Sequence, residues 1–213
     1  MHPVLRLYED VLSDDGWLAL PAAARMIFVT HGSVTIEGGV LTDGEAWHGE
    51  TAVGVTAGGT GATCWRWELG TDAAGPAECH AVRSHEKLSA PLETLPDGEL
   101  LWRGDSVAFP PGGVAHLHRH QGPGIRCVIE GALRVDTHGR STSYGPGGAW
   151  FEAGPDPVFA QAADRPTRFI RVMILPRALI GKSSIQYVNE NDRTKPKSQQ
   201  YKVYVDAPLT MRR

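Results

Sequence analysis

Three histidines at alternate positions are the residues of this chain best suited to chemistry. His116, His118 and His120 follow a Pro-Pro-Gly-Gly run, and a second glycine-rich stretch comes after them. Residues at i, i+2 and i+4 of a β-strand share a face, so a strand here would project three imidazoles together. Neutral imidazoles bind iron, zinc, nickel or manganese, and three buried histidines are costly without a partner. The spacing therefore favours a divalent metal ion, and the alternative is a polar face without a ligand.

Three other residues lie in strand-like segments that could border such a site. Glu152 would supply a carboxylate as a further metal ligand. Arg126 would hold the carboxylate or phosphate of a substrate through two parallel hydrogen bonds, although a surface ion pair with Glu130 fits the sequence equally well. Trp150 would line a substrate pocket or belong to the core.

The elements that must position these residues are short strands. With 25 glycines and 15 prolines among 213 residues, the apolar runs are short, which favours many strands over long helices. Residues 26–36 and 125–135 share one pattern, an apolar run, a glycine and an alternating run, which we interpret as strand, tight turn, strand. Residues 44–49 and 65–69 repeat in the same order as 147–152 and 170–174. The ordered set predicts one β unit used twice.

The repeat divides the chain into four segments. Residues 1–75 are the N-terminal unit, and residues 98–178 are the C-terminal unit with the candidate site. Residues 76–97 are interpreted as a connector, with room for one or two helical turns over 81–92. Residues 179–213 form a tail whose strand-like pieces, 184–188 and 201–205, are joined by a polar loop. A terminal strand of this kind completes a sheet edge of its own unit or of a partner, so a homodimer is expected.

Charge and composition argue against nucleic-acid and membrane partners. The net charge of -3 gives no nucleic-acid signature. No apolar stretch is long enough to span a bilayer and the N-terminus lacks a leader pattern, so a cytoplasmic protein without a membrane partner is expected. Cys64 and Cys127 lie in apolar runs and are interpreted as inert core thiols. From Gly181 onward the chain is more basic, and we interpret its dispersed cations as a solvated surface: Lys182, Arg193, Lys195, Lys197, Lys202, Arg212 and Arg213.

The segment from Gly112 to Gly131 resembles the first motif of the cupin superfamily. In that motif a glycine is followed after five residues by a histidine pair, which His118 and His120 match here. Three residues later comes the position of a glutamate, occupied here by Gly124, and after six more residues comes a final glycine, Gly131. Residues 150–152 and the proline-rich turn after them resemble the second motif. The resemblance covers residues 99–176 and, through the repeat, residues 4–70. It implies an all-β fold of two jelly-roll barrels in tandem, each a double-stranded β-helix.

The resemblance also implies a metal-binding set, and the chain departs from it. His118 and His120 match the family's histidine pair, but the glutamate slot holds Gly124 and the second-motif histidine slot falls on or near Val158. Neither residue can ligate, so His116 and Glu152 are the candidates to complete the set.

The N-terminal unit keeps no ligand of that set. Aligning Gly32 with Gly131 places the histidine pair on Ala19 and Pro21, and the glutamate on Arg25. We therefore expect the site of this unit to be vestigial.

Three functions remain open at this stage. The first is a metal-dependent cupin enzyme acting on a small organic molecule by dioxygenase-, isomerase- or lyase-like chemistry, which the fold does not decide. The second is a metal-free barrel that binds or senses a small molecule, favoured by the absent ligands at Gly124 and Val158. The third is a structural or partner-binding role, which a sealed barrel without a cavity beside His118 would support.

Overall fold

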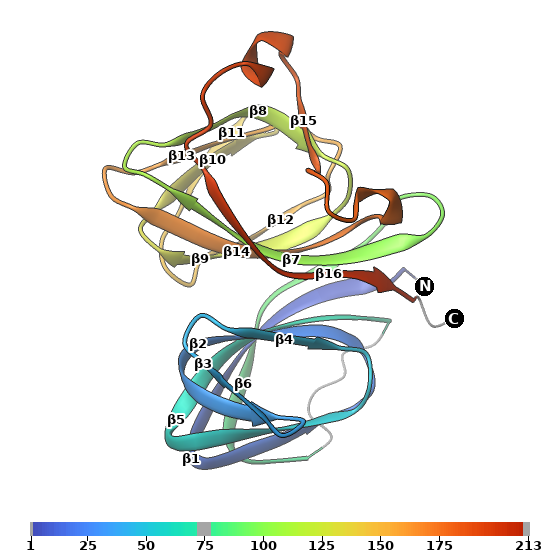
Figure 1. Cartoon of the computed structure of the whole chain (residues 1–213), viewed down its shortest axis with the longest axis vertical. Coiled ribbons are helices and arrows are strands. Elements are labelled where there is room, and N and C mark those ends of the chain that lie inside the picture. The colour runs from blue at the N-terminus through green and yellow to red at the C-terminus, as the bar shows by residue number, and fades with distance from the viewer. Residues whose placement is uncertain (1, 72–77, 211–213) are drawn as a thin grey trace. The chain divides into compact units, whose positions relative to one another are not determined.

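The chain divides after Glu93 into two β units, Met1–Glu93 (unit 1) and Thr94–Arg213 (unit 2). The structure, a computed structural model, describes residues 2–71 and 78–210 (Figure 1). The predicted boundary between residues 75 and 76, and the tail residues Arg212 and Arg213, lie outside the described residues. The all-β prediction is confirmed, because the described elements are strands apart from two short 3-10 helices. Among the described residues, no helix has the length and apolar content needed to cross a membrane.

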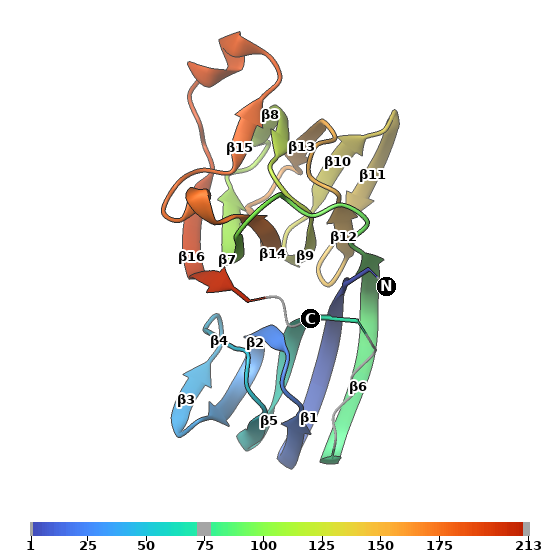
Figure 2. The same cartoon turned by 90° about the vertical axis from the view of Figure 1, so that its right-hand side faces the viewer.

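Unit 1 is an antiparallel sheet of four long strands and the short strands β3 and β4, in the order β3-β2-β5-β1-β6 with β4 pairing on β2 (Figure 2). Alternating side chains of these strands pack into one apolar core that includes Leu18, Ile27, Val34 and Val55. The strands are β1 (Val4–Leu20), β2 (Ala24–Ile36), β3 (Gly39–Thr42), β4 (Ala46–Gly49), β5 (Val53–Gly70) and β6 (Glu78–Pro91).

Strand β6 occupies most of the segment that the sequence suggested as a connector, and that interpretation of residues 78–91 is wrong. The strand pairs with β1 from Val4 opposite Pro91 to Ala19 opposite Glu78. It is the edge strand of its sheet and most of its side chains are exposed. An edge strand without a buried face carries no apolar alternation, so periodicity alone does not reveal it.

Unit 2 consists of two five-stranded antiparallel sheets, in the orders β11-β10-β13-β8-β15 and β12-β9-β14-β7-β16 (Figure 1). Phe109, Val128, Trp150 and Phe169 belong to its main apolar core. The strands are β7 (Leu100–Phe109), β8 (Val114–His120), β9 (Gly124–Glu130), β10 (Leu133–Thr137), β11 (Arg140–Tyr144), β12 (Ala149–Glu152), β13 (Val158–Ala162), β14 (Thr167–Pro176), β15 (Ile185–Tyr187) and β16 (Gln200–Leu209). The 3-10 helices are η1 (Arg177–Leu179) and η2 (Glu190–Arg193).

The tail supplies the last strand of each sheet in unit 2. Strand β15 pairs with β8, and β16 pairs with β7 over its whole length. The two predicted strand pieces are therefore present, and they complete edges of the chain's own sheets. The expected homodimer stays a prediction.

The repeated glycines mark a bend between two sheets at Gly131 and a bend within one strand at Gly32, whereas the sequence suggested hairpin turns. Strand β9, before Gly131, pairs with β12 and β14, whereas β10, after it, pairs with β11 and β13. Gly131 has φ +80, and a Cβ there would overlap with Thr167 Oγ1. Gly32, with φ +82, stands at an irregularity within the continuous strand β2. Glycine is required at such a bend because L side chains disfavour this conformation.

Candidate functional site

A β-bulge in β8 decides which of the three histidines face the interior of unit 2. Ala115 lies opposite Ala160 and His118 lies opposite Val158, so β8 has one residue more than β13 between these pairs. An extra residue reverses the alternation of side chains. Ala115, His118 and His120 accordingly line one inner cavity. The expectation that His116 shares their face is therefore wrong.

The His116 side chain belongs to different surroundings. It is half-buried and lies near Asp192 of η2. The hydrogen bond from Lys195 is the main cause that lowers the pKa of the Asp192 carboxyl, and His116 contributes a smaller effect of the same sign. His116 reaches the interior only through its backbone, because its carbonyl oxygen accepts a hydrogen bond from His118 Nδ1 at 2.7 Å.

The two inner histidines point their Nε2 atoms toward each other. His118 is 5% exposed and His120 is 4% exposed, and the two Nε2 atoms lie 3.2 Å apart. Because a carbonyl oxygen only accepts, His118 must carry its proton on Nδ1, which leaves a lone pair on Nε2. His120 Nδ1 lies 3.3 Å from Ser184 Oγ. Burial lowers the pKa of both imidazoles, that of His120 to well below its usual range, so both are neutral at pH 7.

Glu152 and Arg126 lie beside this pair and hold each other. Arg126 Nη2 is 2.7 Å from Glu152 Oε2, and Trp150 Nε1 donates to Glu152 Oε1 at 2.8 Å. Glu152 Oε2 is also 3.7 Å from His120 Nε2. Burial lowers the pKa of the Arg126 guanidinium to about 10, which still leaves it charged at pH 7. The structure thus brings together Arg126, Trp150 and Glu152 with the two inner histidines.

Gly124, in the slot where the family has a glutamate, is required by packing. Its carbonyl oxygen accepts a hydrogen bond from Arg126 Nη1 at 2.6 Å. A Cβ at this position would overlap with the carbonyl oxygen of Val172 on β14. A side chain therefore cannot be accommodated here without moving a central strand. Val158, in the histidine slot, is buried opposite His118.

Arg171 and Asp105 are two site residues that the sequence reasoning missed. Arg171 Nε and Nη2 donate to the two oxygens of Asp105 at 2.6 Å and 3.2 Å, and Nη1 lies 3.4 Å from His120 Nε2. Burial lowers the pKa of Arg171, but the charge and hydrogen bonds of Asp105 outweigh burial and raise it. The sequence repeat could have pointed to Arg171, because Arg66 and Arg171 occupy the same position in the two matched apolar strands.

In unit 1, Arg66 and Asp10 form the ion pair that corresponds to Arg171 and Asp105. This pair belongs to a buried cluster in which the charges of arginines and carboxylates balance. Arg66 Nε lies 2.6 Å from Asp10 Oδ2 and Nη1 lies 2.8 Å from Glu68 Oε2. Arg25, in the slot of the family's glutamate, contacts Glu68 Oε1 at 2.8 Å through its Nε. Two arginines and two carboxylates cancel in charge, and each is buried. This arrangement suits a structural role.

The donor atoms in unit 2 have a spacing that suits a metal ion, but two arginines lie beside them. The separations of 3.2 and 3.7 Å between His118 Nε2, His120 Nε2 and Glu152 Oε2 are close to the about 3.4 Å expected for neighbouring ligands around tetrahedral zinc. However, Glu152 is held by Arg126, and Arg171 approaches the same His120 nitrogen. A dication would be placed beside two buried guanidinium groups. Within residues 2–71 and 78–210, no cluster of three or more His, Cys, Asp or Glu side chains could hold a metal.

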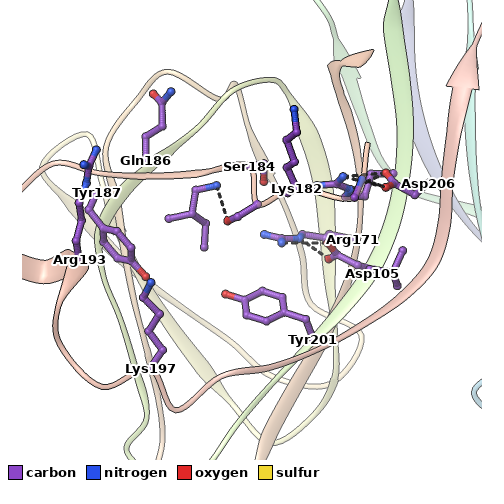
Figure 3. A pocket seen from close by; sticks show the side chains of 15 residues that line it. Asp105, Arg171, Lys182, Ser184, Gln186, Tyr187, Arg193, Lys197, Tyr201 and Asp206 are labelled. Carbon is purple, nitrogen blue, oxygen red and sulfur yellow. Dashed lines mark hydrogen bonds and ion pairs between the residues drawn. The ribbon is translucent and has the colours of Figure 1, made fainter. Parts of the chain in front are cut away.

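Two cavities of unequal size meet at Arg171. The inner cavity beside the histidines has a volume of about 30 Å³. The outer chamber has about 590 Å³ and is lined by β7, β14, β16 and the segment from Gly181 to Lys197 (Figure 3). Arg171, Ile185 and Tyr201 line both cavities. These three side chains stand where the two cavities adjoin.

Comparisons with solved structures identify the fold. Oxalate decarboxylase of Lactobacillus farciminis, in a formate complex, matches with TM-score 0.64 and 14% identity, over 92% of this chain and 82% of that one. A mutant of salicylate 1,2-dioxygenase from Pseudoaminobacter salicylatoxidans matches with TM-score 0.52 and 13% identity, over 81% and 70%. A cupin 2 conserved barrel domain protein from Leptotrichia buccalis matches with TM-score 0.50 and 12% identity, over 81% and 84%.

The sequence comparisons give no match, either to a protein-family model or to a curated protein. The structural likenesses nevertheless extend over both units, since they cover 81% to 92% of the chain. The chain therefore has the fold of the cupin superfamily, in two tandem units.

Proposed function

We propose that unit 2 binds a small organic acid in the outer chamber, with the acid group on Arg171. The observation that carries this proposal is the position of Arg171, a buried guanidinium that lines both the chamber and the inner cavity. Its Nε and Nη2 bind Asp105, whereas Nη1 has only a long contact to His120. This leaves N–H groups of a fixed, planar donor to meet a carboxylate.

The cavity volumes support the outer chamber as the position of the ligand. A cavity of about 30 Å³ holds a water molecule or a small ion. The chamber of about 590 Å³ is within the range of sites for organic molecules. Ile185, Val203 and the Tyr187 and Tyr201 rings provide apolar walls. The sign expected for a structural role was a barrel sealed beside His118; the cavity there is the inner one of about 30 Å³, and the outer chamber adjoins it at Arg171.

The names of two structural neighbours support an organic acid. Oxalate decarboxylase, solved with formate, and salicylate dioxygenase are named after small carboxylic acids. At 14% and 13% identity these neighbours are evidence for the fold alone. The proposal for this chain therefore rests on Arg171 and the outer chamber.

Calorimetric titration of the full chain tests the proposal. Benzoate and hexanoate are compared with benzamide and hexanamide, which have nearly the same shape without the charge. We expect the acids to bind at least about tenfold more tightly, because a charged hydrogen bond to buried Arg171 is lost with the amides. Equal binding of acid and amide would overturn the proposal.

Variants locate the bound acid. Arg171→Gln combined with Asp105→Asn removes both buried charges together, so neither is left unpaired. The matched control is Arg168→Gln with Glu130→Gln, an exposed ion pair between β14 and its other neighbour β9. Loss of benzoate binding in the first double variant and retention in the second is the expected result. Unchanged binding in the first would exclude Arg171 as the acid-binding group.

A metal-dependent enzyme is the second candidate. The observation in its favour is the 3.2 Å separation of the two histidine Nε2 atoms, with the His118 lone pair directed inward. Elemental analysis of untagged protein, beside a His118→Ala/His120→Ala variant, tests it. Near-stoichiometric iron, zinc, nickel or manganese that disappears in the variant would favour this candidate. Absence of metal after soaking with each ion would exclude it.

A further inference from the structure

The outer chamber is more positively charged than the rest of the chain. Two carboxylates line it, Asp105 and Asp206, and five cations do: Arg103, Arg171, Lys182, Arg193 and Lys197. The lining therefore has a formal charge of +3, whereas the whole chain has -3. Three of these cations belong to the basic tail, whose charges the sequence suggested to be a solvated surface. These three side chains are exposed to solvent, as expected, and they also line the outer chamber.

Internal pairing removes only part of this charge. Arg103 binds Asp206 at 2.9 Å and 3.1 Å and also donates to the carbonyl oxygens of Leu179 and Lys182. Arg171 is paired with Asp105. Once both pairs cancel, the tail residues Lys182, Arg193 and Lys197 account for the excess. A cavity lined by one sign of charge attracts ligands of the other sign.

Two of these tail cations lie on the side of the chamber away from Arg171. Figure 3 shows Arg193, Lys197 and Tyr187 on one side, Arg171 on the other, and Tyr201 between them. Lys197 Nζ lies 5.0 Å from the centre of the Tyr187 ring. The partner of Arg193 is Glu190, at 3.3 Å, and both side chains are largely exposed, so this pair is weak.

We propose that the ligand of unit 2 is an organic dianion with an acid group at each end. This inference rests on the proposed function, which places the first acid group on Arg171. The second group, a carboxylate or a phosphate, meets Lys197 and Arg193. The apolar middle of the ligand lies against Tyr187 and Tyr201, whose rings line the chamber. The basic tail is thereby the element that selects ligand length and charge.

Matched mono- and dicarboxylates test this inference by calorimetric titration of the full chain. Adipate, suberate and sebacate are compared with hexanoate, octanoate and decanoate, so each pair has the same number of carbons. We expect the dicarboxylate that spans the chamber to bind about fivefold more tightly than its partner, the size expected for partly exposed ion pairs. Terephthalate and 4-carboxyphenyl phosphate then distinguish a carboxylate from a phosphate at the second position.

Variants of exposed cations assign the gain to the tail. Lys197→Met with Arg193→Met removes the two proposed contacts, and Lys202→Met is the control, since Lys202 lies over Tyr204 on β16. We expect the preference for dicarboxylates to disappear in the double variant, to persist in the control, and hexanoate affinity to change little in either. A preference that survives in the double variant would overturn the inference.

The two proposals fail in different ways. If monocarboxylates bind through Arg171 and dicarboxylates bind no better at any length, the dianion inference is wrong and the organic-acid proposal stands. If neither series binds, the organic-acid proposal fails and the inference falls with it.

Discussion

Arg171 on β14 holds Asp105 on β7 by two parallel hydrogen bonds, and Arg66 holds Asp10 in the same way in unit 1. The shorter contact is 2.6 Å in both pairs. All four side chains are nearly inaccessible to solvent. The duplicated fold has thus kept an ion pair across neighbouring strands in each unit. In unit 1 the arginine has a second carboxylate, Glu68, whereas in unit 2 it faces a cavity.

Removing one partner of the pair in unit 2 should destabilise that unit strongly. Asp105→Asn leaves Arg171 buried beside only a neutral amide, and we expect a loss of about 3–5 kcal/mol in the free energy of unfolding. Asp105→Asn combined with Arg171→Met should recover part of this loss, because no unpaired charge remains. Urea unfolding followed by tryptophan fluorescence measures both. A loss below about 1 kcal/mol for the single variant would contradict the prediction.

Introducing a side chain at Gly124 should lower the stability of unit 2. Gly124→Ala places a Cβ in overlap with the Val172 carbonyl oxygen, so β14 must shift, at a cost of about 1–3 kcal/mol. The control is Gly145→Ala, since a Cβ there meets no atom within 4 Å. Gly124→Glu, which restores the residue type of the family motif, should destabilise further and should not create metal binding. A stable Gly124→Glu variant with stoichiometric metal would show that this packing argument is wrong.

The bulge in β8 predicts unequal effects for the histidines. His116→Ala should change stability by less than about 0.5 kcal/mol, as expected for a side chain outside the core. His120→Ala should cost about 2–4 kcal/mol, because it leaves a cavity and removes partners of buried polar groups. Thermal unfolding by calorimetry compares the two variants. Equal losses would contradict the register assigned to β8.

The cysteines should differ in reactivity. Cys79 is exposed, and burial raises the pKa of the Cys64 thiol to about 12. At pH 8 only about one Cys64 in ten thousand is then a thiolate, which is the reactive form. Ellman's reagent should titrate one thiol rapidly in the native chain, and Cys79→Ser should abolish that phase. All three thiols should react in denaturant.

The raised pKa of Cys64 should make the folded chain less stable at high pH. The Cys64 pKa is higher in the folded chain than in the unfolded chain, whose thiol has an ordinary pKa near 9.0. The contribution of this thiol is therefore complete below pH 9 and is lost as the pH rises from 9 toward 12. Cys64→Ala should lose less stability than the wild type between pH 8 and pH 10. An identical slope in both would rule out this contribution.

The sequence by itself determined the strand content, the duplication and the inward direction of His118 and His120. These follow from local rules, since side chains alternate along a strand and the repeated blocks occur in the same order in both halves. The sequence also singled out Arg126, Trp150 and Glu152, because their types suit a site and they stand in strand-like runs; they line the inner cavity, and their roles stay predictions.

Only the tertiary structure decided the rest. The bulge that turns His116 away exists because β8 pairs with β13, a distant strand. Gly124 is fixed by contact with Val172, and Arg171 meets Asp105 across 66 positions of sequence. The tail lines one part of the outer chamber because β15 and β16 pair with β8 and β7. Each of these features depends on strand pairing between distant segments, and local periodicity carries no information about which segments pair.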